Sequence, residues 1–562
     1  MHLAALAEDH AAKCVAVVRH VSPDVSALNH AEMNETDVCP PLLEEVQDIV
    51  QKLKNNRAAG FDEISAEVLK WGGDAVIEWL HQIIVAVWDS ETAPSDWKKA
   101  LIVPVFKSGD ACVLDNYRGI SLLSIPGKVY SMVIGHRLRD WADKQLLEVQ
   151  SGFRPYRGCN DAIFALRRVH EEALKQHRNL YTCFVDLSKA YDSIDRHLAW
   201  RVFESRGVPV KLLNLLKDLH ADTYCALKGD FTNKPSWFEV KTGFKHGDVN
   251  APMLFNLFID SVIRCIQTAL RQSGVRFVYK MDGQLRESKS RDIQEIAWIL
   301  MFADDIALIT ESEHDMQEAV ELLDQTFAQW GLEMSMKKTK VLLLSPTVGR
   351  DEQLIISRGS IDYVEQFKYL GSTFSMGLQM QNEISARLAK AGSAFFRLNR
   401  LWSDRHVSVQ VRCSVYKTIV QATLLYSCEA WAVTQALLDC LDTFQMRCLR
   451  RICHISLREK RTNSSILEAC KMKSIRSLVR YRRLRWLGHM ARMSDDRLPK
   501  QLLFGSMQFG EHSQVIKDRA PKCWSDYVRE DLIRLKMLYT WDRIAKDRSA
   551  WSERIETILD HT

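Results

Sequence analysis

Two adjacent carboxylates interrupt the apolar run ILMFADDIALIT at residues 299–310. Burying an uncompensated charge is costly, so Asp304 and Asp305 must face either water or a cation. The apolar stretches on both sides predict two buried strands joined by a tight turn that carries the acidic pair. A turn that merely presents aspartate to solvent is the plainer alternative.

A third carboxylate occupies an equivalent place elsewhere in the chain. Asp186 ends the apolar segment YTCFV, so it too is predicted at the tip of a buried strand. Three carboxylates on two neighbouring strands can hold two hard divalent cations about 3.5–4 Å apart. Such a pair activates an attacking oxygen and stabilises a leaving one in phosphoryl transfer. The three acids therefore predict a site for two Mg²⁺ ions, or for Mn²⁺ in their place.

Composition bounds the class of protein. A chain of 562 residues exceeds one ordinary core, and its 46% hydrophobic and 26% charged residues are typical of soluble globular proteins. Its 14 cysteines show no disulfide framework, which indicates a reducing, intracellular setting. The apolar stretches fall short of the roughly 18–20 residues that span a membrane, so no membrane partner is expected. Protein partners cannot be named from the sequence.

One group of possible metal ligands lies in the last third of the chain: Cys440, Cys448, Cys453 and His454. Its spacing matches no common zinc pattern, and cysteines in a helical core are the better interpretation.

The positive charge is concentrated late in the chain. Residues 387–500 contain 23 lysines and arginines against 8 acidic residues, although the whole chain carries only +5. A basic region on a more acidic body indicates that this region binds a polyanion. A solvated helical face rich in arginine is the alternative.

The motifs QSGFRPYRGCNDAI, FVDLSKAYD, HGDVNAPMLF, FADD, GLEMSMKKTK and FKYLGS occur in the order found in reverse transcriptases. The segments NYRGISLL and RYRRLRWLGHMARMSDDRLPKQLLFG also resemble those of LINE-type (non-LTR) retrotransposon enzymes. The resemblance runs from about residue 42 to about residue 535. It implies an α+β, right-hand polymerase with fingers, a palm built on a small antiparallel sheet, and a helical thumb.

The implied divisions follow the change from mixed to helical patterning. We expect an irregular leader over 1–38, fingers and palm over 39–375, a helical thumb over 376–470 and a basic helical extension over 471–562. Full-length elements of this group carry an endonuclease ahead of the polymerase. The leader is too short to contain one, so the chain is expected to lack it.

The resemblance assigns the acids to catalysis and one ring to nucleotide binding. Asp186, Asp304 and Asp305 would bind two Mg²⁺ ions, one lowering the pKa of the primer 3′-hydroxyl and the other holding the triphosphate. Tyr191 would press on the sugar and exclude a 2′-hydroxyl. Considered alone, Tyr191 is more simply a core aromatic.

Three cations are implied in nucleotide binding. Lys107 and Arg118 resemble the fingers pair that clamps the incoming triphosphate, for which the guanidinium fork is suited. Lys338 would help pyrophosphate leave, with Lys337 and Lys340 as neighbouring alternatives. An ordinary surface cation is the alternative for Lys107.

Template and primer contacts come from two further segments. Cations beside aromatic rings in GFRPYRG suit a template path, although an ordinary basic loop looks the same. The segment at 369–371 resembles the hairpin that grips the primer end, although a plain β-hairpin is the alternative. The residues so implied are Arg154, Arg157, Tyr369, Leu370 and Gly371.

The glycine loop departs from the family pattern. His246 stands where glutamine precedes Gly247, and Ala251 stands where serine precedes Pro252. The resemblance implies that His246 and Gly247 bind the nucleotide, with His246 under the templating base pair. The departures are compatible with divergence and with a decaying genomic copy.

The resemblance implies an RNA-directed DNA polymerase that acts on an RNA template, a DNA primer or target, and dNTPs. It would work as a ribonucleoprotein in the nucleus, the cytoplasm or both. A catalytically decayed relic that only binds nucleic acid is the alternative. A group II intron maturase is a weaker option, against which the tail beginning LRWLGHM speaks.

Overall fold

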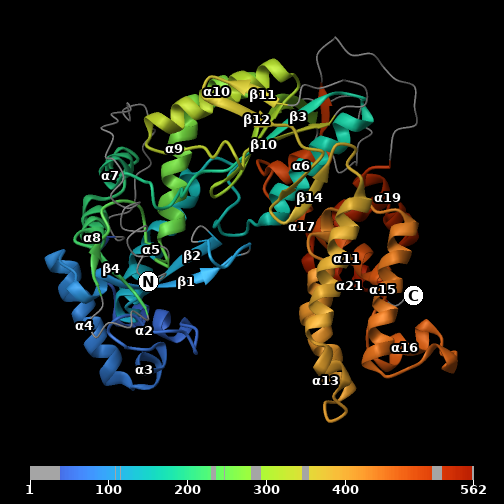
Figure 1. Cartoon of the computed structure of the whole chain (residues 1–562), viewed down its shortest axis with the longest axis horizontal. Helices are drawn as coiled ribbons and strands as arrows, with labels where there is room; N and C mark the ends of the chain where they lie inside the picture. Colours follow the sequence, from blue (N-terminus) through green and yellow to red (C-terminus); the bar gives the residue numbers. More distant parts are fainter. Residues whose placement is uncertain are drawn as a thin grey trace. The chain divides into compact units, whose positions relative to one another are not determined.

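The computed structural model describes residues 38–107, 109–113, 116–228, 236–245, 247–279, 293–344, 353–508 and 522–559. The expected leader therefore lies almost wholly outside the described residues. The chain divides into two compact units whose elements are labelled in Figure 1. Unit 1 comprises Met1–Tyr156, Asp186–Thr268 and Leu322–Ser335, and unit 2 comprises Arg157–Val185, Ala269–Glu321 and Met336–Thr562.

Unit 1 contains a four-stranded sheet of order β2-β1-β4-β5, in which only β1 and β4 are parallel. Val46, Ile49 and Val50 illustrate why its helices form, since they recur at helical spacing and are buried. The strands are β1 (Lys99–Phe106), β2 (Tyr117–Leu123), β4 (Tyr224–Leu227) and β5 (Phe238–Glu239). The helices that lie wholly or mostly in unit 1 are α2 (Leu43–Lys52), α3 (Ala66–Trp71), α4 (Asp74–Ser90), α5 (Ile125–Gln145), α7 (Arg196–Ser205), α8 (Val210–His220) and α9 (Ala251–Gln272).

Unit 2 contains an antiparallel sheet of order β10-β3-β9-β8. Every residue of β3 is buried, which explains its unbroken apolar sequence. The strands are β3 (Leu180–Val185), β8 (Ile299–Phe302), β9 (Asp305–Thr310) and β10 (Lys340–Leu344). Helix α10 (Glu313–Gln329) begins in unit 2 and ends in unit 1.

Smaller strand pairs and many helices complete unit 2. The further strands are β6 (Val275–Tyr279), β7 (Ile293–Ala297), β11 (Gln353–Ile356), β12 (Gly359–Asp362), β13 (Gln366–Tyr369), β14 (Ser372–Ser375) and β15 (Ser506–Gln508). The further helices are α6 (Cys159–Lys175), α11 (Met380–Arg397), α12 (Asn399–Ser403), α13 (Val409–Val415), α14 (Ala422–Leu424), α15 (Gln435–Ile452), α16 (Asn463–Ala469), α17 (Ile475–Ala491), α18 (Leu498–Phe504), α19 (Trp524–Arg534), α20 (Trp541–Lys546) and α21 (Arg548–Glu556).

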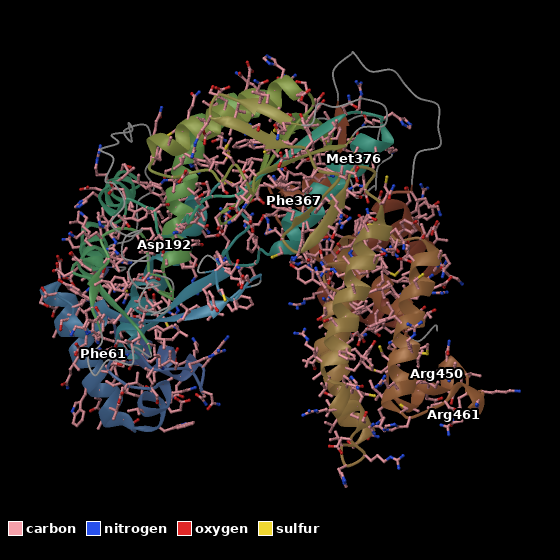
Figure 2. The ribbon with its side chains drawn as sticks, in the orientation of Figure 1. Phe61, Asp192, Phe367, Met376, Arg450 and Arg461 are labelled. Atoms are coloured by element: carbon pink, nitrogen blue, oxygen red, sulfur yellow. The ribbon has the colours of Figure 1, made fainter. Side chains whose placement is uncertain are left out.

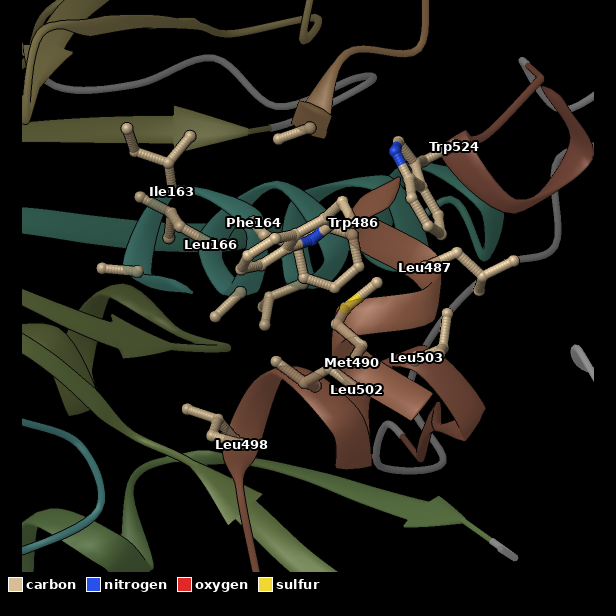
Figure 3. Packing of buried hydrophobic residues seen from close by; sticks show 14 of the residues in the cluster. Ile163, Phe164, Leu166, Trp486, Leu487, Met490, Leu498, Leu502, Leu503 and Trp524 are labelled. Carbon is tan, nitrogen blue, oxygen red and sulfur yellow. The ribbon is translucent and has the colours of Figure 1, made fainter. Parts of the chain in front are cut away.

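The C-terminal helices share one hydrophobic core with α6 and the β3 sheet. Figure 3 shows Phe164 of α6 beside Trp486 of α17 and Trp524 of α19, with ring centroids 6.0 and 5.0 Å apart. Strand β15 pairs with β6, so backbone hydrogen bonds add to this packing. The segment after residue 470 therefore supports the sheet, and its division into thumb and extension stays a prediction.

Helix α9 corrects one expectation from the sequence. Among the described residues, it is the helix whose length and composition would allow it to cross a membrane, with 67% of its apolar window buried in protein. Phe255, Phe258 and Ile259 of α9 are fully buried. A buried core helix can meet the same criterion of length and hydropathy as a membrane span. The sequence did not lead us to expect an apolar helix of that length.

Candidate active site

The acidic pair lies on a tight hairpin in unit 2, as predicted from the flanking apolar runs. Strands β8 and β9 pair up to Phe302 and Asp305, and the connection turns at Ala303, whose φ is +55°. Asp304 is half-buried and Asp305 is exposed, whereas the strand residues behind them are buried. Pairing of apolar strands thus projects two carboxylates from one end of the sheet.

The third carboxylate follows the neighbouring strand. In the β3–β9 ladder Val185 pairs with Ile306, and Asp186 is the next residue along the chain. Strand β3 therefore delivers Asp186 to the end of the sheet at which Asp305 begins β9. The Asp186 carbonyl accepts a hydrogen bond from the Ser335 N–H at 2.8 Å. Strand β3 thus ends at the edge of the unit 2 sheet at which β9 begins.

These acids are a set of hard oxygen donors, which suits Mg²⁺ or Mn²⁺. Within the described ranges, no group of three or more His, Cys, Asp or Glu side chains forms a ready-made metal cluster. The fit therefore rests on the donor chemistry and on the shared strand end.

The β13–β14 hairpin packs beside this edge. Tyr369 is 3% exposed, and its ring lies 5.4 Å from that of Phe184 on β3. Burial, together with the negative charge of Asp305, raises the pKa of Tyr369 well above its usual value. The Tyr369 ring is therefore part of the core. It supports the hairpin turn at Leu370 and Gly371.

Two arginines and a tyrosine brace that turn. Arg387 donates to the Gly371 carbonyl, and Tyr426 Oη donates to the Leu370 carbonyl at 2.8 Å. Arg167 Nη2 donates to Ser372 Oγ at 2.8 Å. Leu370 and Gly371 both have positive φ, +46° and +83°. These contacts fix a strained turn whose bracing residues the sequence did not single out, because they lie on α6, α11 and the segment after α14.

The nucleotide-binding candidates Lys107 and Arg118 lie on one hairpin of unit 1. Arg118 is opposite Val105 in the β1–β2 ladder, and the Lys107 N–H donates to the Asn116 carbonyl at 2.8 Å. Both side chains are exposed. The structure thus brings these two predicted cations together on one strand pair.

The glycine loop before α9 is anchored by buried polar side chains that the sequence did not single out. Lys245 Nζ donates to the Lys98 carbonyl at 2.9 Å, and burial lowers the pKa of Lys245 to about 8. Asp248 accepts a hydrogen bond from Ser131 Oγ at 2.5 Å, and Asn250 Nδ2 donates to the Ser131 carbonyl at 2.7 Å. Lys245, Asp248 and Asn250 recur every two or three positions just before the apolar helix. That spacing was the one feature of the sequence that could have indicated their anchoring role.

Gly247 occupies a conformation that favours glycine. Its φ is +115°, and a Cβ there would lie 2.5 Å from the Ser121 carbonyl oxygen. His220 approaches the same loop, with Nε2 3.5 Å from Asp248 Oδ2. Burial is the main cause that lowers the pKa of His220 to about 4. His246 lies outside the described residues.

Tyr191 packs against the start of α9. Its ring stacks on Phe255 with centroids 4.4 Å apart and an interplanar angle of 21°. The residue is half-buried, and its carbonyl accepts from the Phe244 N–H at 3.0 Å. Tyr191 is thus partly a core aromatic, and its contact with a sugar stays a prediction.

The loop GFRPYRG contains one buried arginine and two exposed rings. Arg154 is buried and ion-paired with Asp143 at 2.7 Å, and it also donates to the Leu147 carbonyl. Phe153 and Tyr156 are 62% and 90% exposed. We assign Arg154 to holding the loop in shape, whereas the exposed rings and the half-buried Arg157 are its outer face.

The lysines before β10 differ in their surroundings. Lys340 is ion-paired with Asp362 of β12. Lys337 and Lys338 are exposed in the turn that precedes the strand. The ion pair makes Lys340 the weakest of the three candidates for contact with pyrophosphate.

Part of the chain matches a known protein family. The family model described as "Reverse transcriptase (RNA-dependent DNA polymerase)" matches residues 105–374. The chain is 23% identical over 421 residues to "RNA-directed DNA polymerase from mobile element jockey" of Drosophila melanogaster, covering 73% of this chain and 43% of that protein. It is 22% identical over 292 residues to "Retrovirus-related Pol polyprotein from type-1 retrotransposable element R2" of Nasonia vitripennis, covering 50% and 26%.

The chain thus spans less than half the length of these relatives. A solved structure titled "Structure of apo telomerase from Candida Tropicalis truncated from C-terminal domain" aligns with 51% of this chain and 55% of that chain. The TM-score is 0.35 and the identity 11%, a likeness too distant to bear on the fold. The family match and the small antiparallel sheet confirm the predicted α+β polymerase class. Residues 105–374 therefore match the reverse transcriptase family model, and the chain is similar to the RNA-directed DNA polymerases of the retrotransposable elements named above.

Proposed function

We propose that this chain is an RNA-directed DNA polymerase that transfers nucleotides from dNTPs to a primer 3′-hydroxyl. The register of β3 against β9 supports the proposal, because Val185, the residue before Asp186, pairs with Ile306, the residue after Asp305. Apolar strands that end in carboxylates at a common edge suit the binding of two divalent ions.

In this proposal Asp186, Asp304 and Asp305 hold two Mg²⁺ ions, or Mn²⁺ in their place. The ions supply activation of the primer hydroxyl and neutralisation of the phosphate charge. The chain's own contribution is to position the carboxylates, since the buried strands behind them leave little freedom to the turn. Acids held in place before the ions arrive lose little entropy when they coordinate.

The exposed cations of the β1–β2 hairpin would bind the triphosphate. Arg118 lies on β2 and Lys107 directly follows β1, so both could reach one polyphosphate chain. Tyr191, supported by Phe255, would limit the space beside the sugar. Lys338 would help pyrophosphate leave, and the 369–371 turn would hold the primer end.

The proposed substrates are an RNA template, a DNA primer or target, and dNTPs. Phe153 and Tyr156 offer exposed rings to unpaired template bases. The proposed setting is a ribonucleoprotein inside the cell, in the nucleus, the cytoplasm or both.

Primer extension on poly(rA)/oligo(dT) with dTTP and Mg²⁺ tests the proposal. We expect extension by the parent chain and a loss of at least about a thousandfold in D304N and in D186N, because each removes a metal-binding charge. E318Q is the matched control, since Glu318 is an exposed acid on α10, and it should extend normally.

Absence of extension by the parent chain, with RNA binding retained, would favour the decayed relic instead. Extension that persists in both aspartate variants would show that the catalytic acids lie elsewhere.

A further inference from the structure

Three cysteines that are far apart in sequence meet in the helical part of unit 2. Cys453 Sγ lies 3.2 Å from Cys470 Sγ, and interaction with the Cys470 side chain lowers the pKa of Cys413. Cys453 and Cys470 follow directly after α15 and α16, and Cys413 lies on α13. Figure 1 shows these helices side by side. The sulfur separation is close enough for a small movement to bring the two thiols into bonding contact.

The surroundings of Cys453 differ from those of an ordinary core cysteine. It is half-buried, whereas Cys470 and Cys413 are 7% and 4% exposed. The hydrogen bond with Cys470, helped by the charges of Arg412 and Arg461, lowers the pKa of Cys453 to about 7. Thiols become reactive toward oxidants when they are partly accessible and largely ionised.

Cys448 lies on α15, the helix that ends just before Cys453, and its thiol is in a different environment. Burial raises the pKa of the Cys448 thiol to about 12, which keeps it protonated and inert. Within the described parts of the chain, no set of His, Cys, Asp or Glu side chains is arranged to hold a metal ion. The chemistry open to the three-cysteine cluster is therefore that of thiols and disulfides.

We propose that Cys453 and Cys470 are a peroxide-sensitive pair that closes to a disulfide bond. The Cys453 thiolate attacks hydrogen peroxide, an S–O bond forms as the O–O bond breaks, and the departing hydroxide takes a proton to become water. The Cys470 sulfur then attacks the sulfenic sulfur, forming the S–S bond. The second hydroxide leaves as water with the Cys470 proton. Two thiols are oxidised, and one peroxide is reduced to two water molecules.

The bond would clamp the segment from residue 454 to residue 469. This segment carries α16 and an exposed basic stretch with Arg458, Lys460 and Arg461. Arg450 holds it by donating to the Arg461 carbonyl at 2.9 Å, and Figure 2 labels both residues. A covalent link between its two ends would suppress local opening of the segment.

Peptide mapping of the full chain tests the proposal directly. Reduced protein is treated with hydrogen peroxide, blocked with iodoacetamide, digested with trypsin and examined by mass spectrometry without reductant. We expect residues 452–458 joined to residues 462–471, 2 Da below the sum of the two peptides, and separation by dithiothreitol. In C470S the joined peptide should be absent, whereas C440S, which changes an exposed cysteine on α15, should form it normally.

Proteolysis of the native chain gives a second measurement that needs no variant. Oxidised protein should be cut by trypsin at Arg458, Lys460 and Arg461 at least about tenfold more slowly than reduced protein. Oxidation of Cys440 without the 453–470 link would overturn the proposal. So would one equivalent of zinc retained by the parent chain and lost in C453S.

Discussion

The acidic hairpin of unit 2 and the glycine loop of unit 1 each carry a sequence motif, yet different interactions hold the two loops in position. The hairpin is positioned by backbone pairing of buried apolar strands, and its two acids are half-buried (Asp304) and exposed (Asp305). The loop is positioned by its own side chains, because Lys245, Asp248 and Asn250 are all buried and hydrogen-bonded to distant backbone or side-chain groups. A loop held by strands owes its position to the backbone, whereas a loop held by polar side chains owes its position to those side chains.

This contrast predicts opposite consequences for substitutions of similar size. Changing an acid of the hairpin should alter activity with little effect on folding. Changing an acid of the loop should alter folding first, because a buried polar group that loses its partners is costly.

The largest expected effect is on catalysis. D305N should reduce primer extension by at least about a thousandfold, because it removes a proposed metal ligand. Its free energy of unfolding in urea should stay within about 0.5 kcal/mol of the parent value, because Asp305 is exposed. A stability loss of several kcal/mol in D305N would break the comparison.

The next effect is on stability in unit 1. D248A should lower the free energy of unfolding by roughly 2–4 kcal/mol, because Ser131 Oγ and the Asn250 N–H lose a charged acceptor in a buried site. Urea unfolding followed by circular dichroism measures this, with D305A as the matched aspartate control. Equal costs for D248A and D305A would show that the two loops are held alike.

A smaller effect is expected from the glycine itself. G247A should cost roughly 1–3 kcal/mol, because positive φ and the contact with the Ser121 carbonyl both oppose a side chain. G331A is the control, since Gly331 has φ of +72° with nothing near a built Cβ. Its cost should be about 1 kcal/mol, and thermal unfolding of the two variants separates the contact from the backbone strain.

The smallest and most gradual effect is that of pH. Burial lowers the pKa of His220 to about 4 in unit 1 and that of His170 to about 3 in unit 2. Both rings are neutral when folded, so the unfolded chain takes up protons first as pH falls below about 6.5. The free energy of unfolding should therefore decrease as pH falls from about 6.5 toward 4, by at most about 1.4 kcal/mol per pH unit for each histidine.

Urea unfolding at pH 7, 6, 5 and 4.5 measures this slope. H220Q should flatten part of it, while H314Q, at an exposed position on α10, should leave it unchanged. A parent chain whose stability does not fall across this range would contradict the assignment of neutral buried rings.

Much of the acidic edge could be predicted from sequence. The apolar runs around Asp304 and before Asp186 predicted strands, and the structure has β8, β9 and β3 at these places. Strand alternation and burial are local properties, and they are visible in consecutive residues. The partners of buried charges were not visible in this way.

Arginines show the limit most clearly. The basic stretch RYRRLRW was expected to face nucleic acid or solvent, yet Arg483 is 2% exposed and ion-paired with Asp531 at 2.7 Å. Arg482 donates to the Leu425 carbonyl, whereas the Arg485 side chain is 59% exposed. Arg483 and Asp531 lie on different helices, and no local pattern links them.

The sequence by itself determined the order of the motifs, the apolar strands, and the placement of acids at strand ends, because each depends on residues near one another in the chain. Only the tertiary structure decided which charges are used internally, as for Arg154 and Arg483, and which thiols meet, as for Cys453 and Cys470. These outcomes depend on how helices pack over long sequence separations. Packing is decided by the shape and burial of whole elements rather than by neighbouring residues.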